Sequence, residues 1–233
     1  MRGARFTRAV HLIYSPSMPN LSLPQFFAVA ILPLLFAITV HEVAHGWMAK
    51  QFGDPTAQRL GRLTLNPIKH IDPLGTILVP GLLLILGGFI FGWAKPVPVT
   101  WENLRHPKRD MAIVAAAGPL SNLLMALFWG LIAKIGLMLG TFSWASVPMQ
   151  YMGQFGIEIN IVLMVLNLFP LPPLDGGRVA VGLLPGPWAW RLASVEQYGF
   201  FILLALLATG ILGKIIGPPI HMMERLVFFL VGL

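Results

Sequence analysis

The stretch FFAVAILPLLFAITVHEVAHGWM, residues 26–48, decides the fold of this chain. Residues 26–40 are apolar except for Thr39, and the sequence HEVAH follows at residues 41–45. A helix rises about 1.5 Å per residue, so about 20 apolar residues cross the hydrocarbon core of a bilayer. The stretch is therefore long enough to span a membrane, and its polar residues lie at one end of the span.

The composition places the whole chain in a bilayer. Of its 233 residues, 56% are hydrophobic and only 11% are charged, whereas a soluble domain carries about 25% charged residues. Nine acidic and sixteen basic residues cannot cover the surface of a water-soluble protein of this size. The net charge of +7 is explained by Lys and Arg in loops that face anionic lipid, so we expect a lipid bilayer and no nucleic acid as partner.

The rest of the chain contains further apolar stretches. They cover residues 74–93, 111–139, 157–168 and 198–216, and a short tail helix follows at 221–230. Pro80 and Gly81 break the stretch 74–93, which predicts a re-entrant segment there, with a full span as the alternative. Residues 92–100, GWAKPVPVT, alternate in polarity and carry two prolines, which predicts a short membrane-associated edge strand or a loop.

These patterns predict an all-α polytopic membrane protein with about four to six transmembrane helices. We expect a basic N-terminal segment at residues 1–23, followed by a single membrane-embedded domain at residues 24–233.

The HEVAH motif is the strongest chemical signal in the chain. On a helix, residues i and i+4 lie on one face, so His41 and His45 can share one metal ion. Glu42 is then placed to act on a metal-bound water. The alternative is that these residues only mark the end of the helix at the membrane interface, but interface residues have no reason to keep this spacing.

The chain has no cysteine, so a tightly bound metal must use His, Asp or Glu, which suits zinc. Catalytic zinc usually takes three protein ligands, and Asp175 is the acid that stands apart. It lies in PPLDGG, residues 172–177, directly after an apolar helix that prolines must interrupt. A turn aspartate before two glycines is the alternative, and spacing alone leaves both interpretations open.

Three motifs together resemble the site-2 protease family of intramembrane zinc metalloproteases. They are the HExxH helix, the segment AAGPLSN at residues 116–122 and the segment NLFPLPPLDG at residues 167–176. No soluble module such as a PDZ domain is inserted between the first and last of these motifs, so the chain resembles the compact branch of the family.

The resemblance implies one zinc ion, with His41 and His45 as ligands and Asp175 completing its coordination. It implies that Glu42 is the catalytic base. It also implies that Asn167 lies near the active site, where it orients the substrate or stabilises the oxyanion.

Three more residues are weaker candidates for substrate binding. Gly118 and Asn122 match the family motif GPLSN, whose role is packing or substrate positioning. His70 lies in LNPIKHIDPLGT, before the expected re-entrant stretch, where a loop histidine is usually structural or solvated. A role for His70 in metal binding or proton transfer is the alternative.

Loop charges predict the orientation. The segments 50–70 and 94–109 are both strongly basic, as cytoplasmic loops are. Placing both in the cytoplasm puts HEVAH and Asp175 at similar depth, although the three N-terminal arginines would then lie outside. We expect an integral multi-pass protein of a bacterial cytoplasmic membrane, with its active site open toward the cytoplasm.

The expected activity is zinc-dependent hydrolysis of peptide bonds in or near the transmembrane segments of membrane proteins, with Glu42 as the base. A metal transporter or sensor is one alternative, but it would need more polar residues through several helices. An inactive scaffold that binds membrane segments is another, but it would gain nothing from keeping Glu42. The sequence names neither the substrate nor the oligomeric state.

Overall fold

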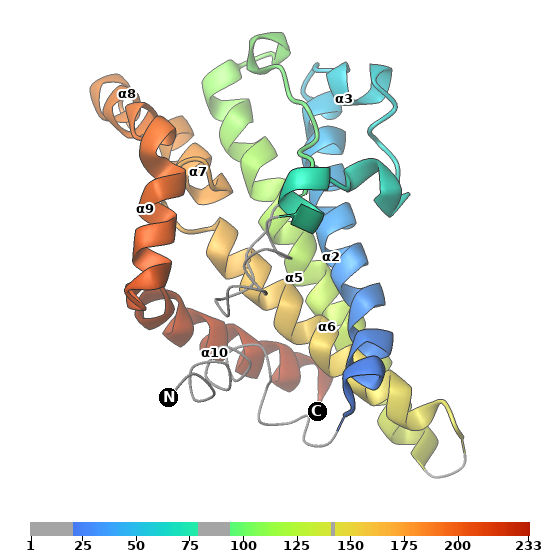
Figure 1. Cartoon of the computed structure of the whole chain (residues 1–233). Helices are drawn as coiled ribbons and strands as arrows, with labels where there is room; N and C mark the ends of the chain where they lie inside the picture. The colour runs from blue at the N-terminus through green and yellow to red at the C-terminus, as the bar shows by residue number, and fades with distance from the viewer. Residues whose placement is uncertain (1–20, 79–93, 141–142) are drawn as a thin grey trace.

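The computed structural model describes residues 21–78, 94–140 and 143–233. This part of the chain is helical and contains no strand, which confirms the all-α prediction (Figure 1). The long helices are α2 (Leu23–Gln51), α5 (Pro107–Leu139), α6 (Ser146–Asn167) and α10 (Ile211–Val231). The shorter elements are α3 (Thr56–Arg59), η1 (Pro67–His70), η2 (Pro73–Leu78), η3 (Trp101–Asn103), α7 (Asp175–Leu183), α8 (Gly186–Ser194) and α9 (Glu196–Ala208).

Three of the described helices are long and apolar enough to cross a membrane, namely Pro24–Gln51 and the helices α5 and α6. The helices α8 and α9 meet at a bend of 62° and would make a fourth span if the pair is counted as one. The chain is therefore a polytopic membrane protein. Most of the expected re-entrant stretch, from residue 79 to residue 93, lies outside the described residues.

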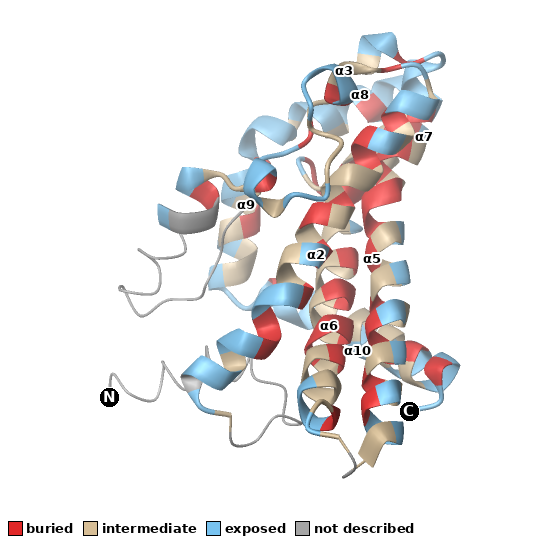
Figure 2. Ribbon diagram, turned by 90° about the vertical axis from the view of Figure 1, so that its right-hand side faces the viewer, coloured by how far each residue is buried: buried red, intermediate tan, exposed pale blue. Residues whose placement is uncertain are grey.

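The helix α5 is the centre of the bundle. It packs most extensively against α6, and also against α2 and α7. Buried residues gather where α2, α5 and α6 face one another, whereas the outer faces are exposed (Figure 2). Large exposed side chains on the outer faces of α2 and α5 are apolar, as a lipid-facing surface requires: Phe27, Ile31, Phe36, Leu124, Phe128 and Leu131.

The start of α2 has clear local causes. The Ser22 backbone N–H donates to Gln25 Oε1 at 2.9 Å, so an otherwise unpaired donor of the first turn is satisfied. Pro24 stands in the first turn, where its missing N–H costs nothing. The helix then runs without a break through the HEVAH motif to Gln51.

The apolar stretch 198–216 was predicted to be one span, and this prediction is wrong. The helix α9 ends at Ala208, and α10 begins at Ile211. Gly210 between them has a φ of +72°, a left-handed conformation that a glycine adopts without steric cost. The helix α10 therefore begins ten residues before the predicted tail helix and crosses the end of the bundle away from α3 and α7 (Figure 1).

Residues 94–100 form a loop, which is one of the two alternatives predicted for residues 92–100, and they form no edge strand; residues 92 and 93 lie outside the description. Pro96 and Pro98 cannot donate to a strand ladder, and the loop is fixed by isolated bonds. The Lys95 N–H donates to the His70 carbonyl oxygen at 2.9 Å. The Thr100 N–H donates to Asp54 Oδ2 at 2.7 Å. These bonds hold the loop against the end of α2.

Candidate metal centre

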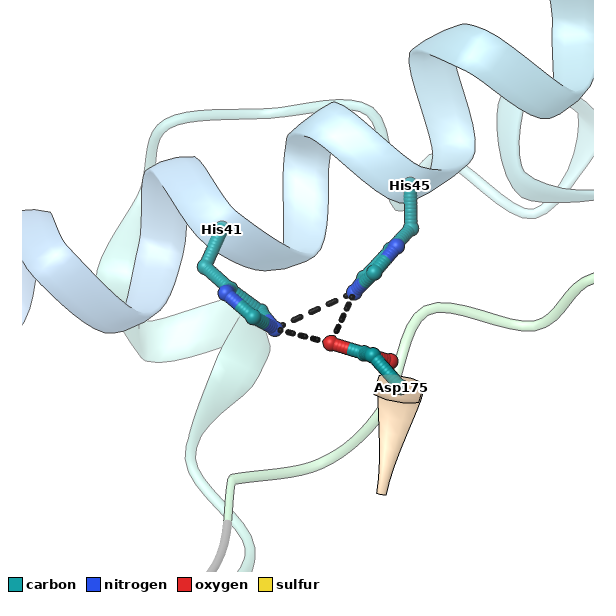
Figure 3. A group of neighbouring side chains, drawn as sticks. All are labelled: His41, His45 and Asp175. Carbon is teal, nitrogen blue, oxygen red and sulfur yellow. Dashed lines mark hydrogen bonds and ion pairs between the residues drawn. The ribbon is translucent and has the colours of Figure 1, made fainter. Parts of the chain in front are cut away.

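His41 and His45 project from one face of α2 toward a common point (Figure 3). Their ring centroids lie 4.7 Å apart, and their Nε2 atoms lie 3.1 Å apart. Both side chains are buried. The spacing of four residues on a continuous helix produces this arrangement, as the sequence predicted.

Asp175 approaches the two imidazoles from α7, of which it is the first residue (Figure 3). The prolines after α6 end that helix and turn the chain back toward α2. Asp175 Oδ2 lies 3.1 Å from His41 Nε2 and 3.3 Å from His45 Nε2. The three side chains form a buried group whose ligand atoms lie within 4.8 Å of one another and could hold one metal ion.

The proton positions follow from the outer hydrogen bonds of the imidazoles. His41 Nδ1 lies 2.6 Å from Asn122 Oδ1, and His45 Nδ1 lies 2.8 Å from the Val114 carbonyl oxygen. Both partners are acceptors, so each Nδ1 must carry a proton. In the neutral imidazoles, both Nε2 atoms then present lone pairs toward Asp175.

This donor set fits a cation. Asp175 Oδ2 is buried and makes no hydrogen bond, although both imidazoles are near it. A carboxylate oxygen and two imidazole lone pairs at this separation repel one another unless a positive ion lies between them. Two nitrogens and one oxygen are a ligand set that zinc takes in catalytic sites.

Proteins named as zinc metalloproteases resemble the chain over most of its length. "Putative zinc metalloprotease YwhC" of Bacillus subtilis is 38% identical over 193 residues, which cover 82% of this chain and 85% of the relative. "Putative zinc metalloprotease Rip2" of Mycolicibacterium smegmatis is 31% identical over 88% of this chain and 76% of the relative. "Putative zinc metalloprotease MJ0611" of Methanocaldococcus jannaschii is 25% identical over 80% of this chain and 84% of the relative.

The chain belongs to the site-2 protease family. It is a membrane metalloprotease, and zinc as its cofactor agrees with both the names of the relatives and the buried donor set. No family model matches the chain. No solved structure matches it either.

Gly118 lies directly behind His41 and His45 in this site-2 protease. A Cβ atom added at Gly118 would lie 2.5 Å from His45 Cε1 and 2.6 Å from His41 Cε1. Real Cβ atoms essentially never approach other atoms so closely, so any side chain here would displace both imidazoles. Gly118 therefore packs against both imidazoles. A direct role in substrate binding stays a prediction.

A cavity of about 300 Å³ opens beside the metal ligands. The other side chains that line it include Glu42, Val97, Trp101, Asn167 and Arg178. Glu42 Oε2 accepts a hydrogen bond from the Val97 N–H at 2.8 Å. The expected base, the candidate metal ligands and the residues of the 94–100 loop therefore face one space.

Asn167 ends α6 at this cavity. Its Nδ2 atom donates to the Leu163 carbonyl oxygen at 3.0 Å. An amide nitrogen carries two protons, so this bond leaves one N–H for another acceptor. Asn167 therefore lines the same cavity as His41, His45 and Asp175, and its role in catalysis stays a prediction.

His70 is not part of this arrangement. It lies neither in the three-residue group nor among the residues that line the cavity. Its side chain is buried, and its Nε2 lies 2.9 Å from the Thr64 carbonyl oxygen. This contact of the His70 side chain holds the loop after α3. A role of His70 in substrate binding stays a prediction.

Two residues near the site had no signal in the sequence. The Arg178 guanidinium lies 5.5 Å from the ring centre of Trp101, and Arg178 pairs with Glu196 at 3.5 Å. Asn160 contacts Asn122, which in turn contacts His41. An arginine after a glycine pair and a lone asparagine in an apolar helix are common, so only the folded structure reveals their neighbours.

Proposed function

We propose that this chain hydrolyses peptide bonds within or near the transmembrane segments of other membrane proteins. The observation that supports it best is that His41, His45 and Asp175 converge inside a bundle of spanning helices, beside a cavity that Glu42 also lines. A metal centre at this position acts on a substrate that reaches it from the membrane.

In this proposal, His41, His45 and Asp175 hold the zinc ion. When bound, zinc polarises the scissile carbonyl and lowers the pKa of a water molecule toward about 7. Glu42 takes the proton of the attacking water and passes it to the leaving amine. Asn167 donates its remaining N–H to the carbonyl oxygen, where negative charge develops during the attack.

The chemistry of cleavage restricts the conformation of the substrate. In an α-helix, the backbone groups of each peptide bond are hydrogen-bonded within the helix and surrounded by side chains. A metal centre cannot reach a peptide bond in that state. The substrate must therefore unwind at the cleaved bond, which favours transmembrane segments weakened by Gly, Pro or Asn.

The orientation follows from the charges beside the site. The end of α2 that carries the motif continues into a region with Lys50, Arg59 and Arg62. Positive charge favours the cytoplasmic side of a membrane. We therefore infer that the cavity opens toward the cytoplasm of a bacterial cell, and that membrane-anchored proteins are released into that compartment.

The experiment that tests this proposal is cleavage of single-span substrates in proteoliposomes, with the new termini mapped by mass spectrometry. The proposal predicts new termini inside the apolar segment or within a few residues of it. Termini confined to soluble parts of the substrates, far from the membrane, would contradict it.

A further inference from the structure

Asn160 is a buried polar residue that has no part in the proposed hydrolysis. It lies in α6 with no exposed surface and touches Asn122 of α5, which is equally buried. Asn122 Nδ2 donates to Asn160 Oδ1 at 2.9 Å, and Asn160 Nδ2 donates to the Gly156 carbonyl oxygen at 2.8 Å. A carboxamide inside a membrane bundle costs free energy unless its groups are paired, and such residues commonly mark a functional element.

Backbone carbonyl groups fix the direction of both amides. The Gly156 carbonyl can only accept, so the NH₂ group of Asn160 faces it and Oδ1 faces Asn122. Asn122 Nδ2 likewise faces the Ala37 carbonyl oxygen at 3.1 Å. The NH₂ group of Asn122 therefore faces two acceptors, Asn160 Oδ1 and the Ala37 carbonyl oxygen. Its Oδ1 points the other way and lies 2.6 Å from His41 Nδ1.

The two histidines differ in how they are held. His45 Nδ1 contacts the Val114 carbonyl oxygen, which the backbone of α5 keeps in place. His41 depends on a side chain, and an amide side chain can rotate or flip. Asn160 and Ala37 present oxygens where a flipped Asn122 would place its own oxygen, so they oppose that flip.

We propose that Asn160 is a positioning residue of the metal centre, which acts through Asn122 to hold His41 with its proton on Nδ1 and its Nε2 free for zinc. Outer partners of metal-bound histidines set ring orientation and tautomer in this way. The inference rests on the proposed function in one respect, namely that His41 is a zinc ligand.

The test is a double-mutant cycle on the purified full chain, with zinc affinity measured by competition with a chromogenic chelator. Loss of an outer partner weakens metal binding by about 10–100-fold. We expect Asn122→Leu to fall in that range and Asn160→Leu to weaken zinc by about tenfold. Because Asn160 acts through Asn122, the double variant should bind zinc no more weakly than Asn122→Leu alone.

Two further variants separate positioning from packing. Asn160→Asp has nearly the same shape, and a buried carboxyl stays neutral, so it can accept from Asn122 and donate to Gly156. It should restore zinc affinity to within about threefold of wild type. Ser146→Ala removes another buried bond between α6 and α5, from Ser146 Oγ to the Gly136 carbonyl oxygen at 2.8 Å. It should leave zinc affinity unchanged.

The inference is overturned if Asn160→Leu binds zinc as tightly as wild type, if the two losses add in the double variant, or if Ser146→Ala weakens zinc equally. If Asn160→Leu does not fold, the smaller Asn160→Ala takes its place in the same cycle. Failure of wild type to bind zinc would overturn the proposed function itself, so the two failures are distinguishable.

Discussion

The Val97 backbone N–H donates to Glu42 Oε2 at 2.8 Å, across 55 positions of the chain. Val97 lies between Pro96 and Pro98, which have no N–H, so it is the only backbone donor among these three residues. A proline also restricts the residue before it to extended conformations, which holds Val97 in place. The loop therefore aims a single donor at the carboxylate that we propose as the base.

Replacing Val97 by proline should impair catalysis without removing the metal. The variant loses the donor to Glu42, and a hydrogen bond to a charged group contributes about 1.5–3 kcal/mol. We expect kcat/KM for a cleaved substrate to fall by about tenfold or more, with zinc content unchanged. Val97→Ala keeps the N–H and is the matched control. Equal activity of the two variants would show that the bond does not matter.

Gly118→Ala should abolish metal binding. The added methyl group would occupy the space of the His41 and His45 rings, which cannot move without leaving the metal position. We expect loss of bound zinc and of proteolysis, with helix content by circular dichroism unchanged. Gly130→Ala in the same helix is the control, because its methyl group would meet the ends of two apolar side chains, Val231 Cγ2 at 2.9 Å and Ile157 Cδ1 at 3.6 Å, and no histidine. Retention of zinc by Gly118→Ala would contradict the geometry of the site.

Asp54 should make stability depend on pH in the acidic range. Burial raises the pKa of its carboxyl, but hydrogen bonds from Asn103, Thr56 and Thr100 outweigh this and lower it below its ordinary value of 3.8. A lowered pKa gives a stabilisation that is present above pH 3.8 and is lost as the pH falls through the lower folded value. We expect Asp54→Asn to unfold roughly 2–8 °C below wild type near neutral pH.

That difference in thermal midpoint should shrink as the pH falls below 3.8, where the carboxyl of the unfolded chain takes up a proton, and should be lost once the pH passes the lower pKa of the folded state. The measurement is a series of thermal melts in detergent over acidic and neutral buffers. A difference that stays constant across the range would mean that the charge of Asp54 does not stabilise the loop.

Zinc should stabilise the folded chain, and this effect should require Asp175. A ligand that binds only the folded state raises stability by about 2.7 kcal/mol at one hundred times its dissociation constant. We expect added zinc to raise the thermal midpoint of the chelator-treated wild type and to leave Asp175→Ala unchanged. An equal rise in both proteins would place the ion elsewhere.

The sequence alone could predict what depends on local spacing. The positions of His41 and His45 on one helical face follow from a separation of four residues, and the long apolar runs predict α2 and α5. The run 157–168 predicts only the second half of α6, which begins at Ser146. The ends of the helices do not follow from these runs, because an apolar run such as 198–216 does not reveal the left-handed conformation of Gly210.

Contacts between distant segments could not be predicted in the same way. Spacing left the role of Asp175 open, and only the family resemblance favoured it as a ligand. The bond between His41 and Asn122 joins residues 81 positions apart, and nothing in the local sequence indicates it. Asn160 had no signal, because its role depends on how α6 packs against α5.

The central claim is that the buried metal centre hydrolyses peptide bonds with Glu42 as its base. The most direct measurement compares wild type with Glu42→Gln on a panel of single-span substrates, with bound zinc quantified in each purified protein. The account predicts that Glu42→Gln keeps its zinc and cuts none of the substrates that wild type cuts. Cleavage by the variant at the wild-type rate would contradict it.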